Sequence, residues 1–251
     1  MSSAIKFRCS SIGKLMAEPK VKSETLSVGA KTYVRELAAQ DIFGVDFIVS
    51  SKEMEKGIDR EDESIGLLNR VRGLSLKKNT ERRTNDWLTG ECDLYDERRL
   101  RGHDIKTSWS LKTFPISEID CVDKLYEHQM GGYMSLWDAE EWEVNYCMVD
   151  TPEGLIRFEP LSLHMVSHIP EEMRVTTWQL KRDRSQEENM FNKICAARQY
   201  YAEVIANFDR THKSHNPAPA PIGPLPWEEE FVPLPSKSKA LRSSLASLLL
   251  A

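Results

Sequence analysis

The chain has 251 residues, of which 40% are hydrophobic and 29% are charged, and its formal net charge is −5. This length and composition suffice for one buried core, with or without a tail. The sequence contains no apolar run long enough to span a bilayer and begins with no charged-then-apolar leader. We therefore expect a soluble protein of the cytoplasm that has no membrane partner.

The cysteines argue against a cysteine-bound metal. They are scattered, odd in number and form no C-x-x-C pair: Cys9, Cys92, Cys121, Cys147 and Cys195. This spacing favours neither a zinc site nor an iron–sulfur cluster. It is typical of free thiols in a reducing compartment.

The first segment predicts a short strand followed by helices. After a strand near Phe7, Ser10 or Ser11 is expected to cap a short helix through residues 15 and 16. The sequence TLSVGAKTYVRELAA, residues 25–39, predicts a second helix.

An acidic helix is expected next, over residues 52–71. Ile58, Ile65 and Leu68 mark one apolar face of this helix. Glu61 lies one position off that face, so its carboxylate could face a site rather than bulk water.

Two strands joined by a hairpin turn are predicted after the acidic helix. Residues 87–95 and 103–108 are strand-like. The run between them, residues 97–102, is short and polar and ends in glycine, which is typical of a turn.

This hairpin carries the most informative residues of the chain. Asp93 and Asp104 lie eleven residues apart, and Lys106 follows Asp104 at i+2 on the same strand face. The hairpin is expected to place Asp93 opposite that face. A carboxylate pair can hold Mg²⁺, and a lysine beside it can orient or help deprotonate an attacking water. The pattern predicts phosphodiester hydrolysis, although Asp-x-Lys alone also occurs at solvated strand edges.

The segment around the hairpin is locally basic. Residues 70–113 contain eleven Lys and Arg against seven Asp and Glu. We expect two groups to contact phosphates: Arg70, Arg72, Lys77, Lys78, Arg82 and Arg83, and then Arg98, Arg99 and Arg101. The alternative is a solvated charged face.

A helix over residues 124–137 is predicted after the catalytic strand. Gln129 and Tyr133 are spaced i, i+4 and so share one face of it. Gly131 and Gly132 between them would allow close approach of backbone or substrate.

The remaining elements complete a mixed α/β domain. A strand is expected over residues 143–149, a return strand over 155–158 and helix from 169 to about 208. We predict a central mixed sheet of about four or five strands flanked by helices.

A Pro-rich tail is predicted over residues 215–251, after a first domain of residues 1–214. Its prolines favour an extended, exposed chain. It also carries apolar residues that would suit a docking peptide: Trp227, Phe231, Leu241, Leu245 and Leu249. A disordered tail with stray apolar residues is the alternative.

Taken together, these motifs resemble the PD-(D/E)XK nuclease superfamily, with its restriction-endonuclease-like core, and within it the phage lambda-type exonucleases and YqaJ-like viral recombinases. The matching residues are Gly57, Glu61, Gly90, Asp93, Asp104, Lys106, Gln129 and Tyr133. The opening FRCSSIGKLM also resembles that family's first segment, and the resemblance covers about residues 5–150. Two positions depart from the pattern. Cys92 replaces a common proline, and Asp104 stands where many relatives have glutamate.

The resemblance implies a role for each site residue. Asp93, Asp104 and the Ile105 carbonyl would bind one or two Mg²⁺, for which Mn²⁺ could substitute, and Glu61 would contribute to a second ion. Lys106 would align the attacking water. The other residues would support it: Gln129 holds the water or the lysine, Tyr133 packs behind it, and Ser10, Ser11 and Ser108 bind substrate.

The resemblance further implies a 5′-to-3′ exonuclease acting on double-stranded DNA ends in phage recombination or replication, in the cytoplasm of the host cell. A homotrimer and a single-strand annealing protein as partner would follow from the same resemblance. Two alternatives stay open: a structure-specific or restriction-type endonuclease, and a non-catalytic DNA-binding or assembly protein with the same fold.

Overall fold

The computed structural model describes residues 5–212. The chain up to Ala206 forms one compact unit, and the fold below is that of this unit. The predicted tail from residue 215, with its tryptophan, phenylalanine and three leucines, lies outside the described residues.

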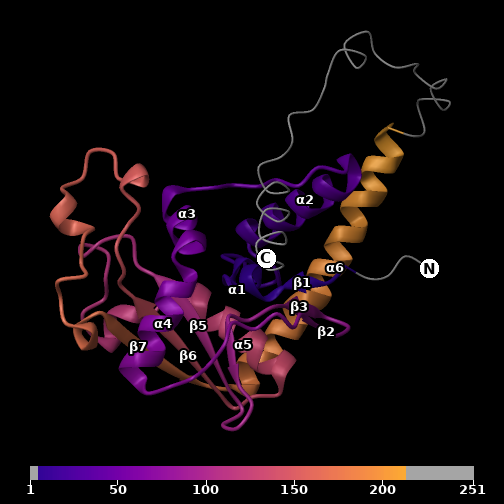
Figure 1. Ribbon diagram of the computed structural model, residues 1–251. Coiled ribbons are helices and arrows are strands. Elements are labelled where there is room, and N and C mark those ends of the chain that lie inside the picture. Colours follow the sequence, from indigo (N-terminus) through magenta and orange to yellow (C-terminus); the bar gives the residue numbers. More distant parts are fainter. Residues whose placement is uncertain (1–4, 213–251) are drawn as a thin grey trace, which may run out of the picture. The chain divides into compact units, whose positions relative to one another are not determined.

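In the described chain, a short first strand is followed by helices α1 to α4, then by strands β2 to β5, and then by α5, β6, β7 and α6 (Figure 1). In order they are β1 (Phe7–Arg8), α1 (Gly13–Met16), α2 (Val28–Phe43), α3 (Lys52–Asp59), α4 (Glu61–Arg72), β2 (Arg83–Thr84), β3 (Leu88–Gly90), β4 (Leu94–Asp96), β5 (Arg101–Thr107), α5 (Lys124–Trp137), β6 (Glu141–Cys147), β7 (Val175–Lys181) and α6 (Arg184–His212). None of these helices is long and apolar enough to cross a membrane.

The larger sheet has four strands in the order β4-β5-β6-β7. The central pair β5 and β6 is parallel, and both outer pairs are antiparallel. In the central pair Asp104 lies opposite Val144 and Lys106 opposite Tyr146. A smaller sheet has the order β1-β3-β2. The predicted mixed α/β fold with flanking helices is confirmed, with its strands divided between two sheets.

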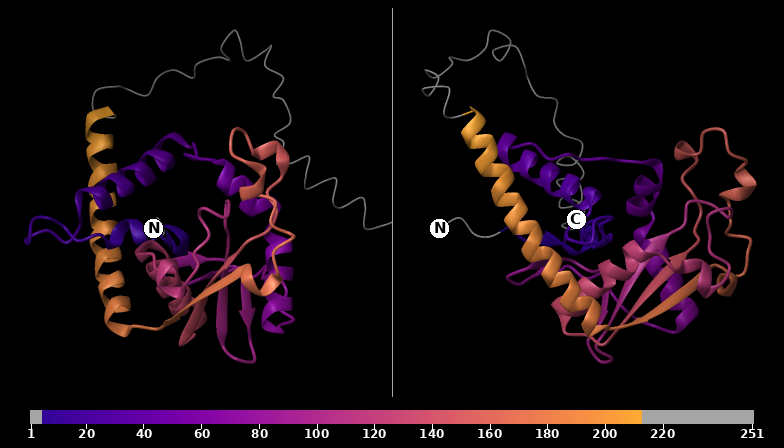
Figure 2. Two further views of the ribbon diagram at one scale, coloured as in Figure 1. Left: turned by 90° about the vertical axis from the view of Figure 1, so that its left-hand side faces the viewer. Right: turned by 180° about the vertical axis from the view of Figure 1, so that it is seen from behind.

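The four-stranded sheet separates two hydrophobic layers, with α4 on one face and α5 with α6 on the other (Figure 2). The layer under α5 and α6 contains buried aromatic and aliphatic side chains: Tyr133, Trp137, Trp142, Val144 and Ile194. The layer under α4 is smaller: Ile65, Leu68, Leu94, Cys147 and Val149. Strand alternation therefore places Asp104 and Lys106 on the face covered by α5.

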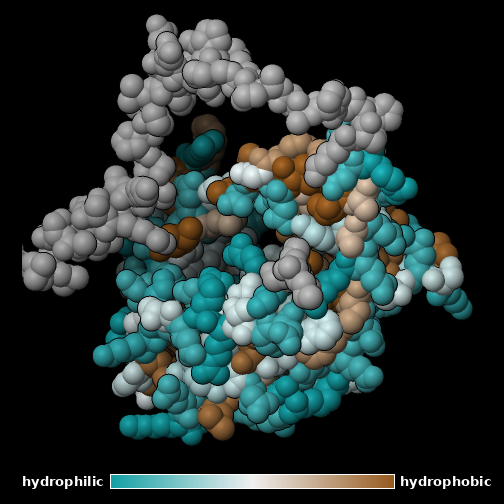
Figure 3. Space-filling model, turned by 90° about the vertical axis from the view of Figure 1, so that its right-hand side faces the viewer, coloured by the Kyte–Doolittle hydropathy of each residue, from teal (hydrophilic) through white to brown (hydrophobic). Residues whose placement is uncertain are grey.

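The outer surface is mainly hydrophilic, as expected from a mean hydropathy of −0.48. On the face shown in Figure 3, hydrophobic residues form separate groups among charged and polar ones. Scattered apolar side chains on a surface are ordinary for a folded protein.

The predicted return strand over residues 155–158 is wrong. Residues Glu153–Leu155 form a 3-10 helix, and Phe158 is 99% exposed, so this segment has no buried face that would favour a strand. The strand that pairs with β6 is β7, in a region predicted to be helical. Its sequence VTTWQLK is rich in β-branched residues, which favour a strand. The helical periodicity begins further along the chain, at α6.

The acidic helix over residues 52–71 is divided in two at Arg60. This residue has φ −109° and ψ 13°, outside the helical region, and separates α3 from α4. The division rotates the predicted apolar face, so that Ile65 and Leu68 are buried while Ile58 is 77% exposed. The strand predicted over residues 87–95 is likewise interrupted, because residues 91–93 separate β3 from β4.

The predicted helix cap at Ser10 or Ser11 is also wrong. Residues Cys9–Ser11 form a 3-10 turn, and α1 begins after Ile12 without a side-chain cap. The 3-10 turn leads directly into α1, so no extended residue with a free hydroxyl precedes the helix.

A charged network lies buried between the sheet and α4. The side chain of Glu143 is 3% exposed, and its carboxylate lies 3.1 Å from His103 Nδ1 and 2.9 Å from Arg101 Nη1. Burial alone would raise the pKa of Glu143, but His103 and the guanidinium groups of Arg72 and Arg101 outweigh it and lower the pKa to about 2. The Glu143 carboxylate therefore stabilises the fold in its ionised form.

We expect the Glu143→Gln variant to be less stable by about 3 kcal/mol at neutral pH. Because the pKa of Glu143 is lower in the folded than in the unfolded protein, this contribution is complete above about pH 4.5. It is lost as the pH falls towards about 2. Urea unfolding at several pH values would measure the difference. The exposed Glu188 provides a control, since its change to glutamine should leave stability unaltered. A constant difference between the Glu143 variant and the native chain across pH would contradict the assignment.

Candidate active site

The structure brings Asp93, Asp104 and Lys106 together at the β4–β5 hairpin. Asp104 is 2% exposed, and its Oδ2 lies 2.6 Å from Lys106 Nζ. Asp93 precedes β4, and its Oδ2 accepts a 2.6 Å hydrogen bond from the Ile105 backbone N–H. Because Ile105 lies between Asp104 and Lys106 in the chain, this bond fixes the Asp93 carboxylate beside them.

The backbone of Ile105 adds an oxygen to this group. The N–H and C=O of one strand residue point to the same edge of the strand. Since the Ile105 N–H points towards Asp93, its carbonyl lies on that side too. Two carboxylates and one carbonyl therefore border the same small volume.

Charge repulsion characterises the site. Burial, together with the charge of Asp104, raises the pKa of Asp93 to about 7. For Lys106 burial acts to lower the pKa, but the charge of Asp104 outweighs it and the pKa lies above its ordinary value. The buried carboxylates thus carry more negative charge than the single ammonium group offsets.

These donors fit a divalent cation that prefers oxygen. Within residues 5–212 no group of three or more His, Cys, Asp or Glu side chains is placed to hold a metal. Mg²⁺ is commonly bound through one or two carboxylates and keeps several waters. Asp93 and Asp104, with the Ile105 carbonyl, match that smaller donor set, and a cation there would relieve their mutual repulsion.

Helix α5 supports Asp104 from one side. Gln129 Nε2 donates to Asp104 Oδ1 at 3.3 Å and to Tyr133 Oη at 3.4 Å, and Tyr133 in turn donates to the Glu91 carbonyl at 3.0 Å. The helix approaches the first segment closely, since a Cβ at Gly132 would lie 3.1 Å from Cys9 Sγ. Gln129 and Tyr133 therefore form one chain of hydrogen bonds behind the carboxylates.

The site opens into a cleft between α3 and the end of β5. Its lining residues include Met54, Gly57, Glu61, Asp93, Lys106, Ser108, Trp109, Tyr126 and Tyr146. Glu61, at the start of α4, lines this cleft but forms an ion pair with Lys78. Its carboxylate is thus in the cleft with Asp93, and it is already neutralised by a lysine.

Ser108 also lies in the cleft, just beyond β5. The residue is 6% exposed, and its hydroxyl has no hydrogen-bond partner in the structure. A buried hydroxyl without a partner is uncommon and suits a group that bonds a ligand.

Several predicted substrate-binding residues lie elsewhere. Arg98 and Arg99 are exposed in the hairpin turn, and Arg101 pairs with Glu141 and Glu143. Ser10 is exposed outside the cleft, and Ser11 lines a different pocket with Tyr33. The structure does not bring these five predicted residues to the carboxylates.

Most of the predicted phosphate-binding group is ion-paired within the chain: Arg70 with Glu171, Arg72 with Glu143, Lys78 with Glu61, Arg82 with Glu91 and Arg83 with Glu81. The acidic partners come from distant elements in several of these pairs. These ion pairs offset most of the positive charge of residues 70–83, so the local excess of Lys and Arg does not produce a basic surface there.

Comparison with solved structures identifies the family. A phage-related exonuclease from Haemophilus somnus 129PT is 35% identical; the match covers 82% of this chain and 97% of that one, with a TM-score of 0.77. The chain belongs to the phage-related exonuclease family. The resemblance inferred from the sequence is thereby confirmed.

Two structures of lower sequence identity have the same fold as this chain. The alkaline exonuclease LHK-Exo from Laribacter hongkongensis is 13% identical, with a TM-score of 0.63 and coverage of 84% of this chain and 95% of that one. Its complex with dAMP gives 15% identity and a TM-score of 0.60. No protein-family model and no curated protein matches the sequence.

Some cleft residues of this exonuclease-family chain were not predicted from the sequence. Trp109 reaches the cleft through tertiary contacts that leave no periodic signal. Tyr126 carried a signal, because it lies three residues before Gln129 and therefore shares its helix face. The centroid of the Tyr126 ring lies 4.3 Å from Lys106 Nζ, so Tyr126 borders Lys106 in the cleft.

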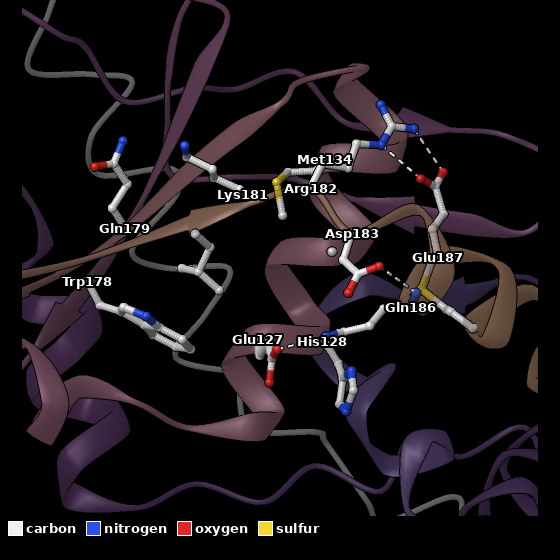
Figure 4. Close-up of a pocket in the computed structure, with 13 residues that line it drawn as sticks. Glu127, His128, Met134, Trp178, Gln179, Lys181, Arg182, Asp183, Gln186 and Glu187 are labelled. Carbon is white, nitrogen blue, oxygen red and sulfur yellow. Dashed lines mark hydrogen bonds and ion pairs between the residues drawn. The ribbon is translucent and has the colours of Figure 1, made fainter.

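A separate pocket lies between α5, β7 and the start of α6 (Figure 4). Its carboxylates all accept hydrogen bonds: Glu187 accepts two from Arg182, Glu127 accepts one from Gln186, and Asp183 accepts from the backbone N–H groups of Ser185 and Gln186. This pocket offers no cluster of unneutralised carboxylates. The α3–β5 cleft is therefore the candidate active site of this chain.

Proposed function

We propose that this protein is a Mg²⁺-dependent deoxyribonuclease that degrades one strand of double-stranded DNA from its 5′ end. The observation that carries the proposal is the convergence of Asp93, Asp104 and Lys106 in an open cleft. The 35% identity to a phage-related exonuclease supports exonuclease activity. The dAMP complex of LHK-Exo agrees with a deoxynucleotide as product.

The site residues divide the chemistry between them. Asp93, Asp104 and the Ile105 carbonyl would hold Mg²⁺, which when bound lowers the pKa of water and offsets charge on the phosphate. Lys106, held by Asp104, would orient the attacking water, and the Gln129 amide would keep Asp104 in place. Glu61 would join the site after separation from Lys78.

Further features of the proposal rest on the family alone. A homotrimer, a single-strand annealing partner and the use of Mn²⁺ in place of Mg²⁺ stay predictions. DNA ends are the substrate that the proposal requires.

The proposal is tested by digestion of linear duplex DNA labelled at either the 5′ or the 3′ end, beside a covalently closed circle. With Mg²⁺ we expect early release of the 5′ label as mononucleotide, late release of the 3′ label and no change in the circle. EDTA should stop the reaction, and Mn²⁺ should restore it. Cleavage of the circle would favour an endonuclease, early release of the 3′ label would reverse the polarity, and no cleavage at all would contradict nuclease function.

A further inference from the structure

Lys56 on α3 is a fully buried lysine, with 0% of its surface exposed. Its Nζ donates to two consecutive backbone carbonyls, that of Ser108 at 2.6 Å and that of Trp109 at 3.0 Å. Within residues 5–212 no carboxylate forms an ion pair with it. A buried ammonium group without a carboxylate partner is unfavourable for stability and therefore calls for a physical reason.

The position of the Ser108 and Trp109 carbonyls explains why a lysine is buried here. Ser108 and Trp109 follow β5 directly, two and three residues beyond Lys106, and both line the cleft. The neighbours of Lys56 on α3, Met54 and Gly57, line the same cleft. Lys56 therefore joins the two walls of the cleft beneath its surface.

The backbone of Ser108 is held on both sides. Its N–H donates to the Cys147 carbonyl on β6 at 2.9 Å, and its C=O accepts from Lys56. The next carbonyl, that of Trp109, also accepts from the Thr151 hydroxyl at 3.0 Å. The one polar group of Ser108 without a partner is its buried hydroxyl, which borders the cleft.

We propose that Lys56 is a positioning residue that fixes the Ser108 hydroxyl where it donates a hydrogen bond to a phosphate oxygen of the bound DNA strand. This inference rests on the proposed function. It assigns Lys56 no contact with substrate, because Lys56 is fully buried and its two hydrogen bonds go to backbone carbonyls beneath the cleft. Burial also lowers the pKa of Lys56 to about 8, and a neutral amine would keep two N–H donors for the same two carbonyls.

The chain contains a matched control in Lys193 on α6. This lysine is 2% exposed, and its Nζ donates to the carbonyls of Met16 and Ala17, each at 3.1 Å. It also contacts Glu18 at 2.9 Å. Lys193 thus joins two elements by the same chemistry but does not line the α3–β5 cleft.

The test compares steady-state cleavage of linear duplex by Lys56→Met, Lys193→Met, Ser108→Ala and the double variant Lys56→Met with Ser108→Ala. We expect Ser108→Ala and Lys56→Met each to lower kcat/KM by about 10-fold or more, because a hydrogen bond to a charged oxygen is lost. The loss should divide between kcat and KM in the same way in both. The double variant should fall no further than Ser108→Ala, and Lys193→Met should retain native kinetics.

Two results would overturn the inference alone: Lys56→Met with the kinetics of Lys193→Met, or losses that multiply in the double variant. Should Lys56→Met fail to fold, Lys56→Gln takes its place, since an amide can still donate to one carbonyl. It should then show an intermediate loss that disappears in the Ser108→Ala background, and a loss that persists there contradicts the inference. A native protein that cleaves no DNA with Mg²⁺ or Mn²⁺ overturns the proposed function, and the inference with it.

Discussion

The Asp104→Asn variant is expected to fold normally and to lose DNA cleavage by at least about 100-fold. Asn keeps the size of the side chain and an oxygen that can accept from Gln129, so the packing beneath α5 is preserved. It removes the charge that would hold Mg²⁺ and that fixes Lys106 at 2.6 Å. Release of end label by equal amounts of each protein would measure the effect, with circular dichroism as the check on folding.

A matched control for this change is Asp183→Asn. Asp183 caps the start of α6 by accepting from the N–H groups of Ser185 and Gln186, and asparagine caps helices equally well. The control should keep native cleavage. An Asp104→Asn protein that cleaves DNA at a near-native rate would remove Asp104, and with it the hairpin, from the active site.

The Gly102→Ala variant is expected to be less stable by about 3 kcal/mol. A Cβ at Gly102 would lie 2.1 Å from the Trp142 ring, far inside van der Waals contact. The ring cannot move easily, because Trp142 is fully buried and stacks on Tyr133 with centroids 5.3 Å apart. Urea unfolding followed by tryptophan fluorescence would measure the loss.

Gly131→Ala is the opposite case and serves as the control. No atom lies within 4 Å of a Cβ at Gly131, which is inside helix α5. Alanine there should raise stability by about 1 kcal/mol through its higher helix propensity. Equal effects of the two changes would mean that Trp142 does not pack against Gly102 as described.

Features defined by local sequence were predictable. The helix over residues 124–137 was predicted with the bounds that the structure shows, because Asp123 caps it and the left-handed Asp138 ends it. The hairpin with Asp93, Asp104 and Lys106 was predicted from a polar turn and strand alternation. In each case neighbours in the chain determine the geometry.

Features that depend on distant partners were not predictable. Arg101 was expected to bind phosphate, yet it pairs with Glu141 and Glu143, which face it only through the register of β5 and β6. No motif in the sequence marks Lys56, and its burial depends on the segment after β5. Pairing across elements decides such roles, and a single sequence does not specify it.

The hydrogen bond between Asp93 and the Ile105 backbone has a consequence for the order of assembly. Both carboxylates lie on one hairpin, and closing a short loop takes microseconds or less. Gln129 and Lys56 come from helices distant in sequence, and their contacts require non-local closure, which is slower. The two carboxylates that we propose bind Mg²⁺ can thus come together while the chain is still partly folded. The contacts that Gln129 and Lys56 make with this hairpin and the segment after it form only with the whole domain.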